Sequence, residues 1–502
     1  MKKLIISLFL ATLLLGLALP KKTNAQVNVQ DSLALVALYN STDGANWDPD
    51  CNFTWLTFPV DQWYGIGVEN SRVTGIYLAI GPPPFFNNCG LNGTIPPEIG
   101  NLTELKELDM SNNINLTGNI PAEIGYLIKL TNLRIRNCSL NSNIPNEICN
   151  ISPLKELNLI NNQLTGPIPD SIGNLINLIS LGLLNNQLTG NIPNSIGNLI
   201  NLTGLGLSNN QLSGSIPNSI GNLINLEGLS LSNNQLTGAI PDEIGSLTSI
   251  AYSLYLDSNK LSGIVPNSIL NLTNIKWLRL NNNLFTSIPD FTSLSYLQRL
   301  KLENNKLSFE DLEPNISLDS IQEFSYSPQD SVNQYADTLV TANSLLTLKT
   351  GIGGTQNQYQ WYLNNTQITG ATDSIYNITQ VSPSDTGIYT CSITNSIVNG
   401  LTLWRKTIHV YTDTLQNMLT SNQQGNIHLW IQNHVLYVKS NKPFSVNTVI
   451  SVYLTDGKQL CSSVIASGKN ETFIVLPANT GNLLLIKIIT GTQCVSKKLI
   501  NL

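Results

Sequence analysis

The sequence predicts a repeat solenoid followed by two β-sandwich domains, and two observations carry this prediction. The first observation is a repeat: the segment NLINLISLGLLNNQLTGNIPNSIG at 174–197 is followed by NLINL, which begins the same unit again. In the second, the repeat stops after Leu318, and short runs with alternating apolar residues follow, separated by Gly, Asn and Asp. The 502 residues are too many for one compact core, which also favours an extended array with further domains.

The repeat has a fixed period in the middle of the chain. An Asn stands three residues after the second strand leucine of each turn, and from Asn162 to Asn234 the step is always 24 residues. The series continues downstream with steps of 25, 24 and 22 residues, and upstream two cysteines take the same position. We therefore predict about ten turns over residues 73–318, with a structural ladder formed by Cys89, Asn113, Cys138, Asn162, Asn186, Asn210, Asn234, Asn259, Asn283 and Asn305.

Each turn follows from simple physical chemistry. Leu181 and Leu183 alternate with a glycine, which is the period of a short strand with its apolar side inward. The buried amide of Asn186 can bond the open backbone groups of its own and neighbouring turns, and Cys can replace it as a small, weak donor. Gly190 gives the backbone freedom, and Pro193 fixes φ on the return path. One turn cannot bury its leucines alone, so stacked neighbours complete a continuous core.

The pattern L-x-x-L-x-L-x-x-N-x-L-x-G-x-I-P resembles a leucine-rich repeat of the plant-specific subtype, over about half of the chain. The resemblance implies a curved solenoid whose concave face is a parallel β-sheet. DSLALVALYNSTDGANW and QWYGIGVENSRVTGIYL resemble the N-terminal cap of the same proteins, which we expect over residues 26–72.

The cap departs from the family pattern. Where its paired cysteines usually flank Trp63 and Gly65, this chain has Asp61 and Val68. We therefore expect the cap to be closed by packing of its tryptophans rather than by that disulfide. The tryptophans concerned are Trp47, Trp55 and Trp63.

Seven cysteines are too few and too widely spread for a disulfide scaffold. Cys51 with Cys89, or Cys461 with Cys494, could pair, and the spacing leaves both possibilities open. Because seven is an odd number, at least one thiol stays free or pairs between chains.

The N-terminus indicates export. Lys2 and Lys3 precede an apolar run that ends at Leu19, and the small residues TNA end at Ala25. This pattern is typical of a secretory signal peptide over residues 1–25, with an uncleaved membrane anchor as the alternative. No other apolar stretch approaches the roughly 20 residues that span a bilayer. We expect no transmembrane segment in the mature chain, and a protein that is secreted or attached to the outer cell surface.

After a polar linker at 319–331, residues 332–411 resemble an immunoglobulin-like domain. The resemblance lies in YQWYLNN, where Trp361 matches the core tryptophan, and in SPSDTGIYTC, where Tyr389 matches the tyrosine corner. The usual cysteine partner of Cys391 is missing, and Leu348 stands near that place. We expect Cys391 to be a buried thiol. Because such domains are more often spacers than binding heads in tandem surface proteins, we expect this domain to be a spacer.

Residues 425–502 resemble the C-terminal sorting domain of type IX secretion in Bacteroidetes. The matching features are Asp456-Gly457-Lys458, Gly481 before an apolar strand, and Lys497-Lys498; Leu483 and Leu484 stand where an aromatic residue is common. The resemblance implies the secretion machinery as a partner, with removal of the tail and either release or surface attachment. The alternative is another adhesive sandwich.

Recognition is expected on the concave face, where the residues that flank each strand leucine point outward. In the middle turns these residues are small: Ser180, Gly182, Leu184, Gly204, Gly206, Ser208, Gly228, Ser230 and Ser232. The aromatic and Arg residues that anchor interfaces stand in later turns, where the predicted ligand-binding residues are Tyr255, Asp257, Trp277, Arg279, Asn281, Arg299, Lys301 and Glu303. An earlier group comprises Glu107, Asp109, Arg134 and Arg136. Ordinary surface variation is the alternative interpretation.

The chain is poor in reactive groups. Its three histidines, His409, His428 and His434, lie outside the repeats, and neither zinc spacing nor a phosphate loop is present. Asp43, Asp48 and Asp50 could bind calcium weakly, but a solvated turn is favoured. Paired carboxylates for glycoside hydrolysis stay open in principle, although no spacing favours them. We expect no enzyme, no cofactor and no metal.

The net charge of −6 and the absence of a basic run argue against nucleic acid as a partner. The sequence therefore predicts an exported protein that contacts a protein or an extended glycan outside the cell. The main hypothesis is protein interaction or adhesion through the concave face. The alternatives are a polysaccharide-binding accessory protein of a secreted glycan-degrading system and a structural coat protein.

Overall fold

The computed structural model describes residues 27–79, 88–413 and, between 427 and 499, the strands given below with short stretches beside them. The predicted signal peptide lies outside the described residues. The chain divides into two compact units. The first runs to Asp330 and also takes in the loops 353–356 and 395–401, and the second holds the remainder.

The first unit begins with the cap. Helix α2 (Val29–Ser41) starts where the Asn28 side chain accepts the N–H groups of Gln30 and Asp31. The buried Asp31 also pairs with Arg72 at 3.0 Å, which ties the helix to the hairpin of β1 (Ile66–Glu69) and β2 (Arg72–Tyr77).

The cap tryptophans pack against one another as predicted. The ring centroids of Trp47 and Trp55 are 4.9 Å apart, those of Trp55 and Trp63 are 4.7 Å apart, and all three side chains are buried. A disulfide joins Cys51 to Cys89, which is one of the two pairings that the spacing left open. This disulfide links the cap to the first turn of the repeats. The prediction that Cys89 serves as a ladder donor is therefore wrong, because its sulfur is used in this bond.

The repeats form one long sheet in the order β1-β2-β4-β6-β8-β9-β10-β11-β13-β15-β17-β18. All pairs after the hairpin are parallel and in register, so that Leu181, Leu205 and Leu229 stack directly. Each strand has three residues: β4 (Glu107–Asp109), β6 (Asn132–Arg134), β8 (Glu156–Asn158), β9 (Ser180–Gly182), β10 (Gly204–Gly206), β11 (Gly228–Ser230), β13 (Ser253–Tyr255), β15 (Trp277–Arg279), β17 (Arg299–Lys301) and β18 (Glu323–Ser325).

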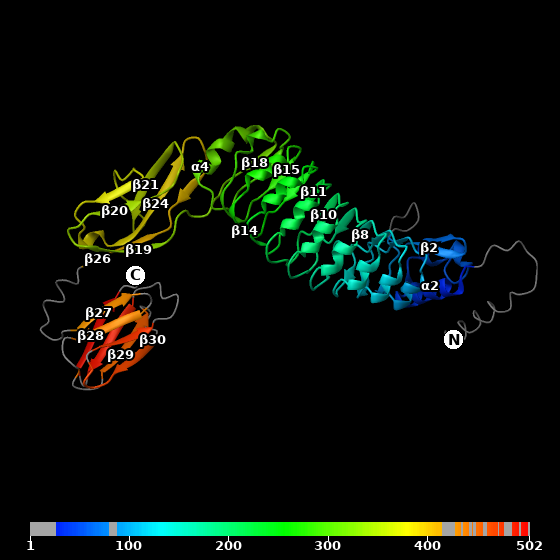
Figure 1. The fold of residues 1–502 in the computed structure, drawn as a ribbon, viewed down its shortest axis with the longest axis horizontal. Coiled ribbons are helices and arrows are strands. Elements are labelled where there is room, and N and C mark those ends of the chain that lie inside the picture. Colours follow the sequence, from blue (N-terminus) through cyan, green and yellow to red (C-terminus); the bar gives the residue numbers. More distant parts are fainter. Residues whose placement is uncertain are drawn as a thin grey trace, which may run out of the picture. The chain divides into compact units, whose positions relative to one another are not determined.

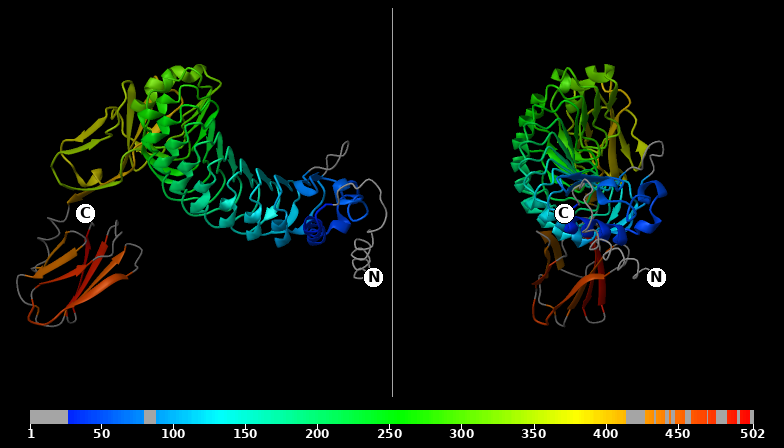
Figure 2. Two further views of the ribbon diagram at one scale, coloured as in Figure 1. Left: turned by 45° about the vertical axis from the view of Figure 1, so that its right-hand side comes forward. Right: turned by 90° about the vertical axis from the view of Figure 1, so that its right-hand side faces the viewer.

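Short 3-10 helices close most turns on the side opposite the strands, as η7 (Asn194–Asn198) does after Pro193. Figures 1 and 2 show the strands stacked along one side of this unit and the helical turns along the other. We call the solvent side of the long sheet the concave face. Two small parallel sheets lie on the return path: β3 (Asn92–Thr94), β5 (Asn115–Gly118) and β7 (Ser139–Leu140), then β12 (Thr237–Gly238), β14 (Lys260–Ile264) and β16 (Leu284–Ser287).

The predicted ladder is confirmed at its eight asparagines and at Cys138. Asn186 donates to the carbonyl oxygens of Leu159 and Leu183 at 2.9 and 3.2 Å, and accepts the Leu164 N–H at 3.0 Å. The other asparagines repeat this pattern, and the Cys138 thiol donates weakly to a carbonyl of the preceding turn at 3.5 Å. Each ladder side chain thus joins two neighbouring turns through groups that water cannot reach.

A second ladder, which the sequence analysis did not predict, is formed by asparagines that directly precede ladder residues, from Asn112 to Asn209. Asn161, Asn185 and Asn209 have φ near +56° (55°, 55° and 57°), a left-handed conformation that Asn tolerates better than most residues. Their exposed amides bond from turn to turn, as Asn209 Nδ2 does with Asn185 Oδ1 at 2.5 Å. The Asn-Asn pair therefore serves two purposes, one buried and one at the surface.

The repeat continues past the predicted boundary. Strand β18 pairs in parallel with β17, and Gln329, 24 residues after Asn305, donates to the Leu302 carbonyl at 2.9 Å. The Asn305 N–H donates in turn to Gln329 Oε1 at 3.1 Å. The predicted linker at 319–331 is wrong over these residues, because a glutamine replaces the ladder asparagine and hides the pattern.

In the second unit, the segment to residue 413 is rich in strands. One sheet holds β19 (Ala336–Thr341), β26 (Ile408–Asp413), β24 (Gly387–Asn395), β21 (Asn357–Leu363), β22 (Thr366–Gln367) and β25 (Thr402–Trp404), and β20 (Leu346–Lys349) pairs with β23 (Ile375–Ile378) in another. Trp361 and Leu348 are buried, and Cys391 is a buried free thiol, as predicted. The Tyr389 hydroxyl donates to the Asp385 carbonyl at 2.8 Å.

The last segment has two further sheets: β27 (Ile427–Gln432), β28 (Val435–Ser440) and β31 (Glu471–Val475), and β30 (Gln459–Ile465), β29 (Thr448–Leu454), β32 (Leu484–Thr490) and β33 (Gln493–Leu499) in that order. Cys461 and Cys494 lie on the edge strands β30 and β33, three strand spacings or about 14 Å apart, which is too far for the second open pairing. Asp456, Gly457, Lys458 and Gly481 lie outside the described residues. Among the residues that are described, no helix has the length and apolarity to cross a membrane.

Candidate binding surface

The aromatic and basic residues predicted for recognition come together in two rows on the concave face. Tyr255, Arg279 and Lys301 are in register across β13, β15 and β17. Trp277 and Arg299 form the second row, two residues earlier in β15 and β17. They flank the buried leucines of these strands, so the pleat turns them toward solvent. We call these five residues the concave patch.

Within the concave patch, cations lie over aromatic rings. The Arg279 guanidinium is 4.5 Å from the centroid of the Tyr255 ring, and the Arg299 guanidinium is 5.4 Å from that of Trp277. Stacking holds a guanidinium in one orientation and leaves its N–H edge for a partner.

An acidic residue from the strand that the sequence prediction missed lies beside the concave patch. Glu323 on β18 is 2.7 Å from Lys301 Nζ and 3.9 Å from Arg299 Nε. The hydrogen bond from Lys301 lowers the pKa of Glu323. The patch thus holds aromatic and Arg residues, the types enriched in protein interfaces, with an acidic residue at its edge.

Three predicted ligand residues are buried or hydrogen-bonded within the chain. Asp257 is buried and accepts the Ser232 hydroxyl at 2.5 Å, and Glu303 accepts the Ser325 hydroxyl at 2.6 Å. Asn281 is only 7% exposed. Asp257 and Asn281, each two residues after the end of its strand, are buried, so the prediction of these two as exposed ligand groups is wrong.

Two buried polar atoms at this surface have no hydrogen-bond partner in the described part of the chain: Trp277 Nε1 and Asn281 Oδ1. Trp277 Nε1 is a donor on strand β15, and Asn281 Oδ1 is an acceptor two residues after the end of that strand. An unpaired buried polar group costs about 1–3 kcal/mol, so a ligand that supplies the missing partners would gain affinity. Trp277 belongs to the concave patch, and Asn281 lies beside it.

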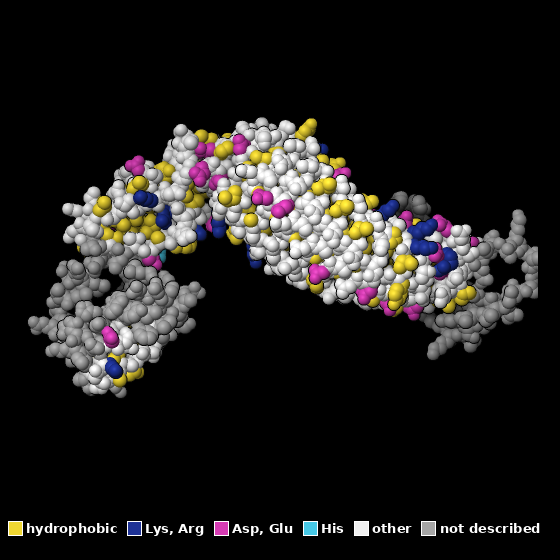
Figure 3. Space-filling view, viewed as in Figure 1, with side chains coloured by type: hydrophobic (Ala, Val, Ile, Leu, Met, Phe, Trp, Pro, Cys, Tyr) yellow, Lys and Arg dark blue, Asp and Glu magenta, His cyan; other side chains and the backbone are white. Residues whose placement is uncertain are grey.

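In the earlier charged group, Arg134 is already paired with Glu156, an acidic residue of the next strand. Arg134 donates to Glu156 through Nε at 2.8 Å and through its terminal nitrogen at 2.5 Å. Burial alone would raise the pKa of Glu156, but the Arg134 guanidinium outweighs it and lowers the pKa. The strand residues of β9, β10 and β11 in the middle turns carry no charge. Figure 3 shows few charged side chains over the middle turns, and more of them near the cap and near the last turns.

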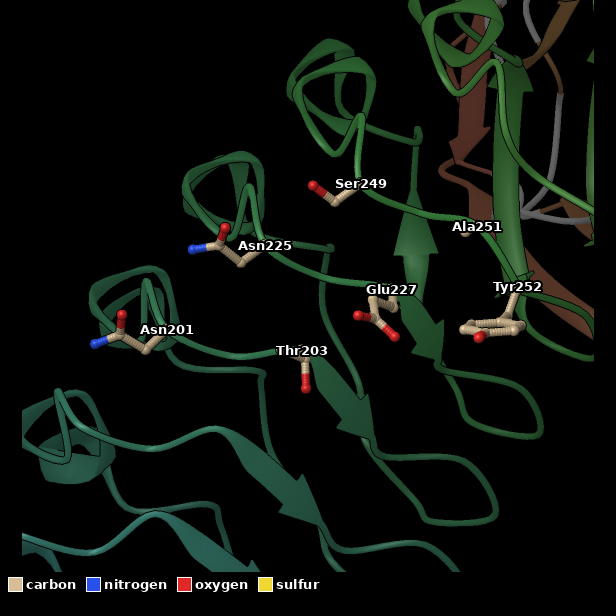
Figure 4. A pocket seen from close by; sticks show the side chains of 7 residues that line it. All are labelled: Asn201, Thr203, Asn225, Glu227, Ser249, Ala251 and Tyr252. Atoms are coloured by element: carbon tan, nitrogen blue, oxygen red, sulfur yellow. The ribbon is translucent and has the colours of Figure 1, made fainter.

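A shallow hollow beside the middle strands was not predicted. It has a volume of about 510 Å³ and is lined by Asn201, Thr203, Asn225, Glu227, Ser249, Ala251 and Tyr252 (Figure 4). The sequence signal that marks it is the 25-residue step from Asn234 to Asn259, the turn that contains Tyr252.

In the described residues, no group of three or more His, Cys, Asp or Glu side chains is placed to hold a metal ion. The acidic cap turn has structural contacts instead. Asp43 accepts from Asn46, and Asp48 caps helix α3 (Pro49–Asn52) by accepting the Asp50 N–H at 2.9 Å.

These strands, turns and ladders define a leucine-rich-repeat solenoid. A family model described as Leucine rich repeat matches residues 251–307, and a second, Leucine Rich Repeat, matches residues 129–151, 153–175, 201–223 and 225–247. A search of curated proteins gave no match.

Solved structures with a similar fold include plant receptor ectodomains. One is the ectodomain of the membrane receptor kinase GASSHO1/SCHENGEN3 from Arabidopsis thaliana in complex with Casparian Strip Integrity Factor 2, with 32% identity, a TM-score of 0.50, and coverage of 61% of this chain and 39% of that one. Another is the Arabidopsis receptor kinase HAESA with the peptide hormone IDA and the co-receptor SERK1, with 29% identity, a TM-score of 0.49, and coverage of 62% and 55%.

A third is a plant ice-binding protein, with 24% identity, a TM-score of 0.48, and coverage of 61% and 97%. The present chain thus spans less than two thirds of either receptor chain. The chain resembles ectodomains that bind ligands.

Proposed function

We propose that this protein is an exported, cell-surface or secreted interaction protein that binds a protein partner through the concave patch. The observation that carries the proposal is a cluster of half-buried aromatic and Arg side chains, in which a guanidinium lies over each aromatic ring. Beside them lie two buried polar atoms without a hydrogen-bond partner, Trp277 Nε1 and Asn281 Oδ1. Truncation of such anchors typically costs more than 1 kcal/mol in an interface. The mechanism is rigid contact by a preorganised surface rather than catalysis.

The first test captures the partner and measures its affinity. The full chain serves as bait for proteins of the medium and cell surface, and the captured protein is then purified. Trp277→Ala and Arg279→Ala should each weaken binding by about tenfold or more. Trp277→Phe keeps the ring but lacks the indole N–H, so it should also weaken binding.

The matched control is Tyr296→Ala, which removes an exposed tyrosine outside the concave patch. It should leave affinity unchanged. Unchanged affinity in both Trp277→Ala and Arg279→Ala would remove the proposal.

The downstream segments complete the proposal. Residues 332–411 form an immunoglobulin-like sandwich that spaces the solenoid, an assignment supported by the buried Trp361 and the Tyr389–Asp385 bond. Residues 425–502 form a second sandwich that addresses the protein to the secretion machinery, which rests on the sequence resemblance. Deletion of 425–502 should abolish delivery to the surface or medium, and unchanged delivery would refute the sorting role.

A further inference from the structure

The hollow beside the middle strands is a trough with two walls. One wall carries Asn201, Asn225 and Ser249, which lie beside the helical turns, and the other carries Thr203, Glu227 and Tyr252, which precede strands β10, β11 and β13 (Figure 4). The two walls take nearly equivalent positions from three successive turns. Polar groups therefore repeat along the trough at the spacing of the turns, about 4.8 Å.

The aromatic residue of the trough results from the one turn with a longer approach to its strand. Three residues separate Ile250 from Leu254, where the preceding turn has two between Leu226 and Leu229. The Ala251 and Tyr252 N–H groups both donate to the Glu227 carbonyl, at 3.3 and 3.1 Å, which holds the extra residue in place. The Tyr252 side chain is consequently 51% exposed.

Several polar side chains of the trough are held before any ligand arrives. Asn201 and Asn225 each donate to a carbonyl of the preceding turn at 2.8 Å. The Thr203 hydroxyl donates likewise to the Ile179 carbonyl at 3.3 Å. Groups that are already oriented lose less conformational entropy when they bind.

The trough carries one charge of each sign, Glu227 in its lining and Lys276 beside the Tyr252 ring, so an ionic ligand of either sign meets one repelling group. The Glu227 carboxylate repels phosphate and carboxylate groups, and the Lys276 ammonium, 5.4 Å from the centroid of the Tyr252 ring, repels a cation at that ring. Amides and hydroxyls that both donate and accept match sugar hydroxyls, and an exposed aromatic face accommodates the C–H face of a sugar ring.

We propose that this trough binds a neutral polysaccharide chain, with Tyr252 packed against one sugar ring and Glu227 accepting hydroxyl groups. The trough shares no residue with the concave patch, although the two adjoin where the Trp277 N–H donates to the Tyr252 carbonyl at 2.9 Å. The inference does not rest on that patch binding a protein. It adds a second kind of ligand to the same solenoid.

The test is calorimetric titration of the full chain with neutral hexasaccharides of β-glucan, mannan and galactan, and with a polygalacturonate hexamer as the acidic counterpart. At least one neutral hexasaccharide should bind, and the acidic one should bind more weakly. Tyr252→Ala should weaken binding by about tenfold or more, and Tyr252→Phe should retain it. Glu227→Gln should weaken it by several-fold, and Ser249→Trp should block the trough.

Two variants separate this proposal from general effects. Tyr296→Ala removes an equally exposed tyrosine elsewhere and should change nothing. Trp277→Ala should leave saccharide affinity intact even where it abolishes partner binding, so failure of one site is distinguishable from failure of the other. No binding of any neutral hexasaccharide, preference for the acidic one, or wild-type affinity in both Tyr252→Ala and Ser249→Trp would overturn the proposal.

Discussion

Replacement of one ladder asparagine tests how the turns are joined. Asn210 donates to the Leu183 and Leu207 carbonyls at 2.9 and 3.1 Å and accepts the Leu188 N–H at 3.0 Å, all in buried surroundings. In Asn210→Ala the buried N–H loses its acceptor and the two carbonyls lose a donor. At about 1–3 kcal/mol for an unsatisfied N–H, and less for carbonyls with a second lone pair, we expect a loss of about 3 kcal/mol in the free energy of unfolding.

The assay is urea unfolding of the full chain followed by far-ultraviolet circular dichroism. Gln211→Ala, at the exposed neighbouring position, should change the free energy of unfolding by less than about 0.5 kcal/mol. Asn209→Ala should cost about 1 kcal/mol, because Ala disfavours the left-handed φ of 57°. A loss below about 1 kcal/mol in Asn210→Ala would refute the reasoning, since packing alone would then hold the turns.

Four further outcomes are expected. Removal of the Cys51–Cys89 disulfide by a double Ala variant should lower the free energy of unfolding by about 4 kcal/mol for its separation of 38 residues, measured by urea unfolding; no change would contradict this. Burial raises the pKa of the Cys138 thiol to about 11, above the unfolded value of about 8.5, so stability should fall as pH rises from about 9 to 11. The same thiol should resist a disulfide reagent at pH 8 until urea unfolds the chain, and rapid labelling of the native protein would argue against its burial. Tyr389→Phe loses the bond to the Asp385 carbonyl and should cost about 1 kcal/mol, seen as a lower urea midpoint.

The solenoid could be predicted because its core is periodic. Leu181 and its equivalents repeat at a fixed step, and so do the ladder asparagines, so one turn determines the next. The prediction failed where a single residue changed the pattern. Gln329 occupies a ladder position that the sequence pattern assigns to Asn. Cys89 stands at a ladder position in the sequence, but its sulfur forms a disulfide with Cys51.

The candidate sites were less predictable, because side-chain direction depends on small changes in the backbone. Trp277 and Arg279 could be found from the alternation of the strand, but that alternation does not continue past the strand end, where Asp257 and Asn281 are buried. The aromatic residue of the trough, Tyr252, lies in the turn with one extra residue, which the sequence shows as a 25-residue step. The step alone does not predict a hollow, because the lining residues come from three turns that are brought together only by stacking.

Hydroxyl-radical footprinting of the full chain with its captured partner tests the central claim most directly. The account predicts that Tyr255 and Trp277 lose labelling in the complex, while the exposed Tyr126 and Tyr296 keep it. Unchanged labelling of Tyr255 and Trp277, with protection confined to surfaces away from the concave face, would contradict the account.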